Sequence, residues 1–203
     1  TGKECFPAIV TTGDMVKRAL QPDFDRDRYA FFMGGSGGPC RFGQYNALQR
    51  LVLDELGYED VPIYAPNQAS RFYSDLGLVG RKFLRLAWRA VVAADLLEKA
   101  LLEIRPYETV PGAAEKTYWD ALEDLCDSLR EGGSLDDVRE AARRAREAFE
   151  RVPVDRGQVK PIIGLVGEFY VRCNRFSNQN VIRQIESLGG EVWMSPAYEW
   201  FLY

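Results

Sequence analysis

The chain has 203 residues, of which 46% are hydrophobic and 28% are charged, as is typical of folded globular proteins. Its formal net charge of −4 argues against a nucleic-acid partner, and no apolar run is long enough to span a membrane. Histidine is absent, which excludes Ser-His-Asp triads, Cys-His pairs and histidine-ligated zinc. The chemistry that remains uses cysteine, carboxylates, lysine, arginine, tyrosine and the backbone. The four cysteines form no CxxC pair and no disulfide-rich pattern, so we expect a reduced, cytoplasmic protein.

The first part of the chain reads as a helix followed by a strand, a glycine-rich turn, a helix and a second strand. A ragged apolar face after Pro7 predicts the first helix, and the continuous apolar run 29–33 predicts a strand covered on both faces. Apolar residues spaced by three and four predict a helix that ends near Gly57, and residues 61–65 form the next predicted strand. This order is that of a βαβ unit with parallel strands.

A helical block follows, and then a second βαβ unit. The apolar periodicity predicts helices over 81–104, near 118–131 and after Ser134, which with Asp137 resembles a capping box. Residues 161–166 and 191–194 read as strands flanking a helix over 181–188. The sequence therefore predicts an α/β fold in three segments: a first α/β segment (1–66), a mainly helical insertion (67–155) and a second α/β segment (156–203).

Neither end of the chain looks natural. It does not begin with Met, and it stops in the apolar run 200–203. We therefore expect an excised fragment of a larger protein.

The four cysteines include two that precede predicted helices, Cys5 and Cys40. Cys40 follows a glycine-rich turn, and backbone N–H groups at a helix start favour the thiolate, which is the form that binds metals. The alternative is a tight turn in which Cys40 is a small buried residue, and for Cys5 it is an ordinary thiol. The turn is not a nucleotide-binding P-loop because Lys-Ser/Thr does not follow the glycines.

A second candidate site follows the strand at 161–166, where ligands bind in open α/β sheets. Glu168 comes directly after that strand, and Arg172, Cys173 and Arg175 follow in a polar stretch. The arginines can hold a phosphate or a carboxylate, or they can make structural ion pairs. Glu168 can equally be a loop-capping carboxylate, and Cys173 a free surface thiol.

Four strings carry a resemblance to a known family: Cys5-Phe-Pro, Thr11-Thr-Gly-Asp14, Gly38-Pro-Cys-Arg-Phe-Gly-Gln-Tyr45 and Gly167-Glu-Phe-Tyr-Val-Arg172. The chain resembles the 2-hydroxyacyl-CoA dehydratase-like domains of acyl-CoA dehydratase activase-related proteins. The string that ends at Tyr45 is the specific one, and the similarity is weakest from about residue 70 to 155.

The resemblance implies a flavodoxin-like fold that carries a [4Fe–4S] cluster for low-potential electron transfer to acyl-CoA chemistry. Its cysteine positions fall on Cys5 and Cys40, and a third ligand would be Cys173, a residue in a missing segment or a residue of another chain. Cofactor contacts are expected from the glycine-rich turn and the residue after Cys40, and anionic substrate contacts from the second site. These residues are Gly34, Gly35, Gly37, Gly38 and Arg41 for the cofactor, and Glu168, Arg172 and Arg175 for the substrate or another anion.

The resemblance also implies the partners: an ATP-hydrolysing activase domain or subunit, a dehydratase subunit and an acyl-CoA. No ATP site is visible in this chain, so we expect the fragment alone to be inactive. The alternative function is a cluster-free flavodoxin-like module that docks a protein partner or an acyl-CoA. Thiol catalysis at Cys40 is weaker because no histidine can act as its base.

Overall fold

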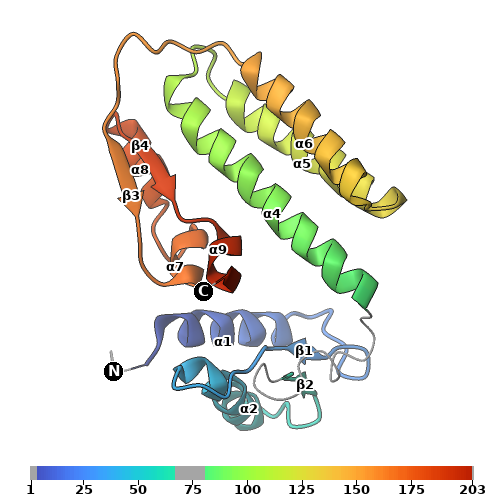
Figure 1. Ribbon diagram of the computed structural model, residues 1–203. Coiled ribbons are helices and arrows are strands. Elements are labelled where there is room, and N and C mark those ends of the chain that lie inside the picture. The colour runs from blue at the N-terminus through green and yellow to red at the C-terminus, as the bar shows by residue number, and fades with distance from the viewer. Residues whose placement is uncertain (1–3, 67–80, 203) are drawn as a thin grey trace. The chain divides into compact units, whose positions relative to one another are not determined.

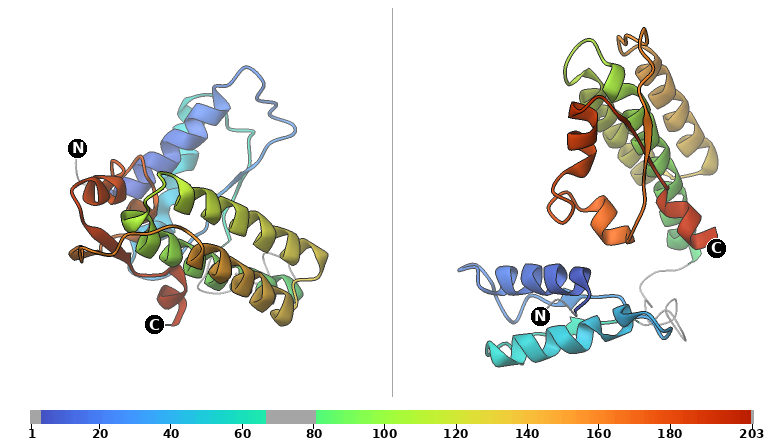
Figure 2. Two further views of the ribbon diagram at one scale, coloured as in Figure 1. Left: turned by 90° about the horizontal axis from the view of Figure 1, so that it is seen from above. Right: turned by 90° about the vertical axis from the view of Figure 1, so that its left-hand side faces the viewer.

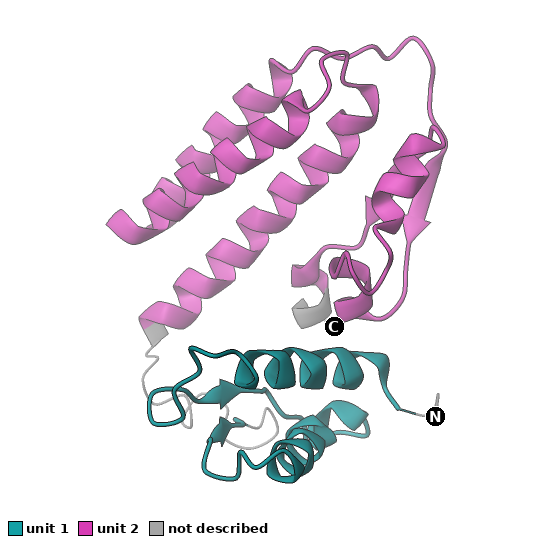
Figure 3. Cartoon of the chain, turned by 180° about the vertical axis from the view of Figure 1, so that it is seen from behind, with its two compact units in different colours: residues 1–79 teal, residues 80–203 magenta. Residues whose placement is uncertain are grey.

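The computed structural model describes residues 4–66 and 81–202, and the chain divides into two compact units, Thr1–Val79 and Gly80–Tyr203 (Figure 3). Unit 2 contains both the predicted helical insertion and the predicted second α/β segment. Residues 67–80, which begin that insertion, lie outside the described residues. Both units combine helices with a small parallel sheet, so the fold is mixed α/β. None of the described helices is both long and apolar enough to cross a membrane.

Unit 1 contains the first predicted βαβ unit. Strands β1 and β2 pair in parallel, with Phe31 opposite Ile63 and Phe32 opposite Tyr64, and helix α2 lies between them in sequence (Figure 1). The parallel pairing predicted from the sequence is confirmed. In chain order the elements are α1 (Phe6–Ala19), β1 (Phe31–Phe32), the 3₁₀ helix η1 (Arg41–Gln44), α2 (Tyr45–Glu55) and β2 (Ile63–Tyr64).

The core of unit 1 lies between its helices and the start of β2. Leu53 of α2 and Val61 are fully buried, and the Arg50 guanidinium donates to the carbonyl oxygens of Tyr58 and Val61 at 2.6 Å each. These bonds fix the chain that leads into β2 against α2. The predicted burial of the first strand on both faces is wrong for Phe32, which is 57% exposed, because the described sheet has only two strands and leaves one face open.

Three long antiparallel helices form the larger part of unit 2. They pack on one another along their length (Figure 2). Small and aliphatic side chains such as Ala114, Ala141 and Leu125 are buried in the core between them. The capping box predicted at the last of them is confirmed, since Ser134 accepts from the Asp137 amide and Asp137 from the Ser134 amide. The helices are α4 (Arg81–Ile104), α5 (Ala113–Glu131) and α6 (Leu135–Glu150), with η2 (Arg105–Tyr107) after α4.

The second predicted βαβ unit is also present. Strand β3 pairs in parallel with β4, from Ile162 opposite Glu191 to Leu165 opposite Met194, and two short helices connect them. The elements are β3 (Ile162–Leu165), α7 (Phe169–Cys173), α8 (Val181–Ser187), β4 (Glu191–Met194) and α9 (Ala197–Leu202).

Helix α4 joins the two parts of unit 2. One side of it packs on α5 and α6, and another contacts β4 and α9, as the ribbon views show (Figures 1 and 2). At the second contact, the Tyr198 amide at the start of α9 donates to the Asp95 carboxylate at 2.8 Å. The helical block is therefore a support on which the second βαβ unit is assembled.

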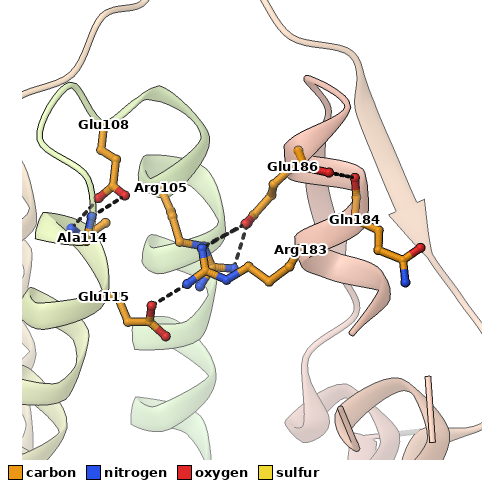
Figure 4. A network of polar contacts seen from close by, with 9 residues as sticks. Arg105, Glu108, Ala114, Glu115, Arg183, Gln184 and Glu186 are labelled. Atoms are coloured by element: carbon orange, nitrogen blue, oxygen red, sulfur yellow. Dashed lines mark hydrogen bonds and ion pairs between the residues drawn. The ribbon is translucent and has the colours of Figure 1, made fainter. Parts of the chain in front are cut away.

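A buried ion pair strengthens this junction. Arg105 of η2 donates to the Glu186 carboxylate of α8 at 2.7 and 3.0 Å, and their side chains are only 5% and 8% exposed (Figure 4). Arg183 also contacts Glu186 and pairs with Glu115 of α5 (Figure 4). Nearby, the Tyr107 hydroxyl donates to Glu191 of β4 at 2.8 Å. Polar contacts from η2 and α5 thus hold both α8 and β4.

Replacing Glu186 with leucine should destabilise unit 2 by about 3–5 kcal/mol, because it leaves the Arg105 charge buried without its partner. Urea unfolding followed by circular dichroism measures the loss. A double variant, Arg105→Met with Glu186→Leu, should recover most of it, since no buried charge then remains uncompensated at this position. The exposed pair partner Glu150, changed to Gln, serves as the control and should unfold like the wild type. Wild-type stability of Glu186→Leu would contradict this account.

Candidate functional site

The two cysteines of unit 1 both stand at helix starts, as the sequence predicts. Cys5 is the N-cap residue of α1 and Cys40 is the N-cap residue of η1, which runs directly into α2. Both have extended backbone conformations, and neither side chain makes a capping hydrogen bond. Cys40 is exposed and Cys5 is partly buried, and both are free thiols. The Cys40 side chain is therefore open to solvent, whereas that of Cys5 is partly covered.

Tyr45 connects the two helix starts. Its hydroxyl donates to the Sγ atom of Cys5 at 2.7 Å, and its ring packs edge-on against Phe42 of η1, with ring centroids 5.3 Å apart. Tyr45 is itself only 7% exposed and is the first residue of α2, five positions after Cys40. The contact brings the start of α1 to the end of unit 1 where α2 begins (Figure 1). The specific string of the resemblance thus lies beside Cys5.

The glycine-rich turn before Cys40 satisfies some of its own backbone amides. The Gly35 amide already donates to the Pro66 carbonyl at 2.8 Å, and the Gly38 amide donates to Ser36 Oγ at 3.3 Å. Two of the four amides expected to face a cofactor therefore have partners within the protein. Gly34, Gly35, Gly37 and Gly38 also have ordinary negative φ values, so the turn does not use the left-handed conformation that glycine allows. Arg41 lies exposed on η1.

The glycine with the clearest structural requirement is Gly43, which the sequence analysis did not single out. A Cβ atom at this position would lie 2.1 Å from the Ser36 carbonyl oxygen, because η1 folds back onto the turn. Gly34 is next to the ring of Phe42, at 3.2 Å from a Cβ placed there. The glycines at 34 and 43 therefore allow the turn to pack closely on η1. No local pattern in the sequence predicted this packing.

The described residues do not form a complete metal site. Within 4–66 and 81–202, no three His, Cys, Asp or Glu side chains gather in an arrangement that could hold a metal ion. Cys5 and Cys40 provide two thiols at one end of unit 1, whereas a thiolate-bound cluster takes four ligands. Cys173 belongs to unit 2. Of the three cysteines expected as ligands, two therefore belong to unit 1 and one to unit 2.

The predicted arginines of unit 2 line a small pocket, which we call the arginine pocket. It has a volume of about 50 Å³ and lies between α4 and the chain that follows β3. That chain leaves the carboxyl end of a parallel strand, where ligand sites of α/β folds occur. The charged and thiol side chains that line it are Glu98, Arg105, Arg172, Cys173, Arg175 and Arg183.

Two of the four arginines of this pocket are neutralised by carboxylates. Arg105 is paired with Glu186, and Arg183 with Glu115 and Glu186. Arg172 donates through Nη1 to the Ser195 carbonyl at 3.3 Å, but its Nε atom is buried and has no hydrogen-bond partner within the described part of the chain. The guanidinium of Arg175 makes no hydrogen bond or ion pair with any described residue. Arg172 and Arg175 thus keep donors for another group.

Glu98 of α4 is the only carboxylate among the described residues that line this pocket. It makes no hydrogen bond or ion pair with described residues. Burial raises its pKa first, and the negative charge of Asp95 adds to the effect, although the nearby arginines oppose it. Glu98 in turn raises the pKa of the Tyr118 hydroxyl, which burial has already raised. Sequence reasoning missed Glu98 because it looks like any charged residue on a long amphipathic helix.

Cys173 and Glu168 have different positions around α7. Cys173 lines the arginine pocket and is exposed there, but the nearby protein still desolvates its sulfur in part, and this effect, followed by the charge of Glu98, raises the pKa of its thiol. Glu168 is the N-cap of α7 and accepts from the Val171 amide at 2.8 Å, so it takes the capping role that the sequence analysis held as its alternative. The structure therefore brings together Arg172, Cys173 and Arg175 in one pocket.

A second hollow, of about 130 Å³, lies on the other side of Glu98, where β4 ends. Carboxylates from α4, β4 and α9 surround it, together with Trp193 and Tyr198. They already have internal contacts: Asp95 accepts from the Tyr198 amide, and Glu199 from the Ser195 hydroxyl at 2.9 Å. The first of these bonds links α4 to α9, and the second is local to the start of α9.

Comparisons with known proteins yield no match for this chain among family models, curated proteins or solved structures.

Changing Gly43 to alanine should destabilise unit 1 by about 1–3 kcal/mol, because the new methyl group overlaps the Ser36 carbonyl oxygen. The matched control is Gly13→Ala in the exposed middle of α1, where a Cβ meets nothing. That control should gain about 0.5–1 kcal/mol, since alanine favours the helix. Chemical unfolding of both variants measures the difference, and equal stabilities would argue against the close packing of the turn on η1.

Replacing Glu98 with glutamine should speed the alkylation of Cys173. Removing the negative charge lowers the raised pKa of this thiol, so more thiolate is present at a given pH. Site-resolved mass spectrometry after a short exposure to iodoacetamide near neutral pH gives the rate. Glu147→Gln on α6, which removes an equal charge elsewhere, should leave the rate unchanged. If Cys173 is alkylated at the same rate in Glu98→Gln and Glu147→Gln, the charge of Glu98 does not act on the Cys173 thiol.

Proposed function

We propose that the chain is an iron–sulfur redox module related to the 2-hydroxyacyl-CoA dehydratase and activase systems. Cys5 and Cys40 are its contribution to a [4Fe–4S] cluster used for low-potential electron transfer to acyl-CoA chemistry. The observation that supports this is the placement of two uncapped, free thiols at two helix starts at one end of unit 1. The family resemblance of the strings around them is the second support.

The electrostatics of the two helix starts favour this chemistry. A thiolate-ligated cluster is negatively charged, and the N-terminus of a helix carries partial positive charge. The 14 residues of α1 begin after Cys5, and η1 continues without a break into the 11 residues of α2 after Cys40. The Tyr45 hydroxyl, which donates to Cys5 Sγ, adds a hydrogen bond to a ligating sulfur. Hydrogen bonds of this kind tune the potential of such centres.

The ligand set needs completion, and the proposal names two sources. Cys173 is one, and residues outside this chain are the other, since a cluster held by thiolates takes four ligands. The raised pKa of the Cys173 thiol disfavours the thiolate, and so favours ligands from elsewhere. In this proposal the cluster lies at the surface of the module, where Cys40 is exposed.

The proposal also includes a flavodoxin-like fold, an activase and a dehydratase as partners, and a cytoplasmic location. The two parallel βαβ units fit a flavodoxin-like arrangement, which an experimental structure of the parent protein would test. An ATP-hydrolysing activase domain or subunit would supply the electron, and a dehydratase subunit with its acyl-CoA would use it. We propose the cytoplasm as the location, because free thiols persist in reducing compartments.

The competing function is a cluster-free module that docks an acyl-CoA or a protein. The internal partners of the Gly35 and Gly38 amides favour it, because they leave fewer donors for a cluster in the turn. The arginine pocket favours it too, since the pocket offers cationic donors without any metal. The test below separates the two functions.

Anaerobic reconstitution of the full chain with iron and sulfide should yield a brown protein, and Cys5→Ala and Cys40→Ala should each remove most of the bound iron. The reason is that each variant deletes one of only two matched thiolate ligands. Iron and sulfide analysis together with Mössbauer or EPR spectra identifies the cluster type.

Two further cysteine variants act as controls. Cys126→Ala on α5 should retain iron, because this thiol belongs to a helix of unit 2 and the resemblance gives it no ligand role. Cys173→Ala decides the third ligand: loss of iron places it in the set, and retention assigns the rest to another chain. A chain that stays colourless, or that binds iron equally well without Cys5 and Cys40, would leave the cluster-free module as the function.

A further inference from the structure

We propose that the arginine pocket of unit 2 binds a small oxyanion, a phosphate or carboxylate group, between Arg172 and Arg175. The pocket lies in unit 2 and uses neither Cys5 nor Cys40, so this inference does not rest on the cluster. It names the chemical class of a ligand for the site that follows β3.

The first support is the charge balance inside the pocket. Arg105 and Arg183 are compensated by Glu186 and Glu115, which fix them as parts of the wall. Arg172 and Arg175 then leave two positive charges against the single negative charge of Glu98. Arg172 is partly buried, and its unpartnered Nε–H costs free energy, whereas Arg175 is exposed and contributes its charge at the edge of the pocket. An incoming anion would remove that cost.

The second support is the supply of unused donors. The buried Nε–H of Arg172 has no acceptor, and the guanidinium of Arg175 has none among the described residues. Asn180 also lines the pocket, and its side-chain amide makes no hydrogen bond within the described chain. Guanidinium groups bind carboxylate and phosphate oxygens with paired, charge-assisted hydrogen bonds. The donors therefore match an oxyanion better than a neutral polar ligand.

The third support is size and position. A cavity of about 50 Å³ accommodates a few water molecules, which is room for one small oxyanion group. The walls are stiff, because Arg105 and Glu186 form a buried pair and the Asn178 side chain donates to the Val171 and Arg172 carbonyls at 3.0 and 2.7 Å. The last two bonds hold α7, which carries Arg172. The Arg172 donors are thus preorganised for a ligand, whereas Arg175 and Asn180 are exposed side chains of the same pocket.

Glu98 controls the strength of this site. It faces charged and titratable groups from every element around it, and only when it is protonated do both arginine charges act unopposed on an anion. Its neighbours are Asp95 on α4, Arg105 on η2, Tyr118 on α5, Arg172 and Cys173 on α7, Arg175 beyond it, Arg183 on α8, and Glu191 and Glu199 on the side of the second hollow. Anion binding should therefore tighten as the pH falls through the raised pKa of Glu98.

Calorimetric titration of the full chain with sulfate tests the proposal, because the charge of sulfate stays constant between about pH 5 and about pH 8. Arg175→Gln should weaken sulfate binding by about tenfold, the expected loss for one charge-assisted hydrogen-bonded contact. Arg175→Lys, which keeps the charge without the planar fork, should retain part of the affinity. The matched control is Arg146→Gln, an exposed arginine of α6 that pairs with Glu150, and it should bind sulfate like the wild type.

Glu98→Gln provides a second measurement, the pH dependence of sulfate binding, which would not change if Glu98 only supported the fold. It should bind sulfate more tightly than the wild type at about pH 8 and should lose the pH dependence over the titration range of Glu98. Circular dichroism confirms that each variant is folded. Cys5→Ala should bind sulfate normally, which separates this site from the proposed cluster.

Inorganic phosphate, acetate and coenzyme A then distinguish the sources of the oxyanion. If coenzyme A competes with sulfate and its binding depends on Arg175, the pocket binds a phosphate of the coenzyme. Acetate that competes better than phosphate assigns it to a carboxylate. The proposal is overturned if sulfate binds no better than chloride at equal ionic strength, or if Arg175→Gln and Arg146→Gln weaken binding equally.

Discussion

The buried ion pair between Arg105 and Glu186 is the contact on which the arrangement of unit 2 depends. It joins η2, at the end of the long helix α4, to α8 in the second βαβ unit. Two charges buried together are stable only as a pair, so the helical block and the βαβ unit are held in one relative position. Tyr107 with Glu191, and Asp95 with the Tyr198 amide, add hydrogen bonds along the same junction.

That junction also makes the arginine pocket. Arg105 forms an ion pair with Glu186, and Arg183 forms ion pairs with Glu186 and Glu115, so these two arginines line the pocket with their charges compensated. The charges of Arg172 and Arg175 remain for other partners. Glu98 comes into the pocket from α4, which is the support of the whole unit. The charged residues that stabilise the junction therefore lie next to those that would bind an anion in the arginine pocket.

The two βαβ units present their candidate residues in the same way. In each, a short parallel strand is followed by a turn and a helix start, and the candidate groups lie there: Cys40 after β1, and Arg172 after β3. Parallel strands are normally covered on both faces. Here Phe32 and Ile162 are 57% and 68% exposed, so each small sheet leaves apolar surface uncovered in the described structure.

The sequence by itself determined the order of elements, both parallel βαβ units, the three long helices and the helix starts at Cys5 and Cys40, because apolar periodicity and turn residues are local signals. It also marked Arg172 and Arg175 as candidates from their place after a strand. Only the tertiary structure decided which charges are already paired. Arg105 and Glu186 are 81 positions apart, and Glu98 meets Cys173 across the fold. Such contacts depend on how helices pack, which no local pattern encodes. For the same reason Gly43, rather than the glycines before Cys40, proved to be the residue that the turn requires.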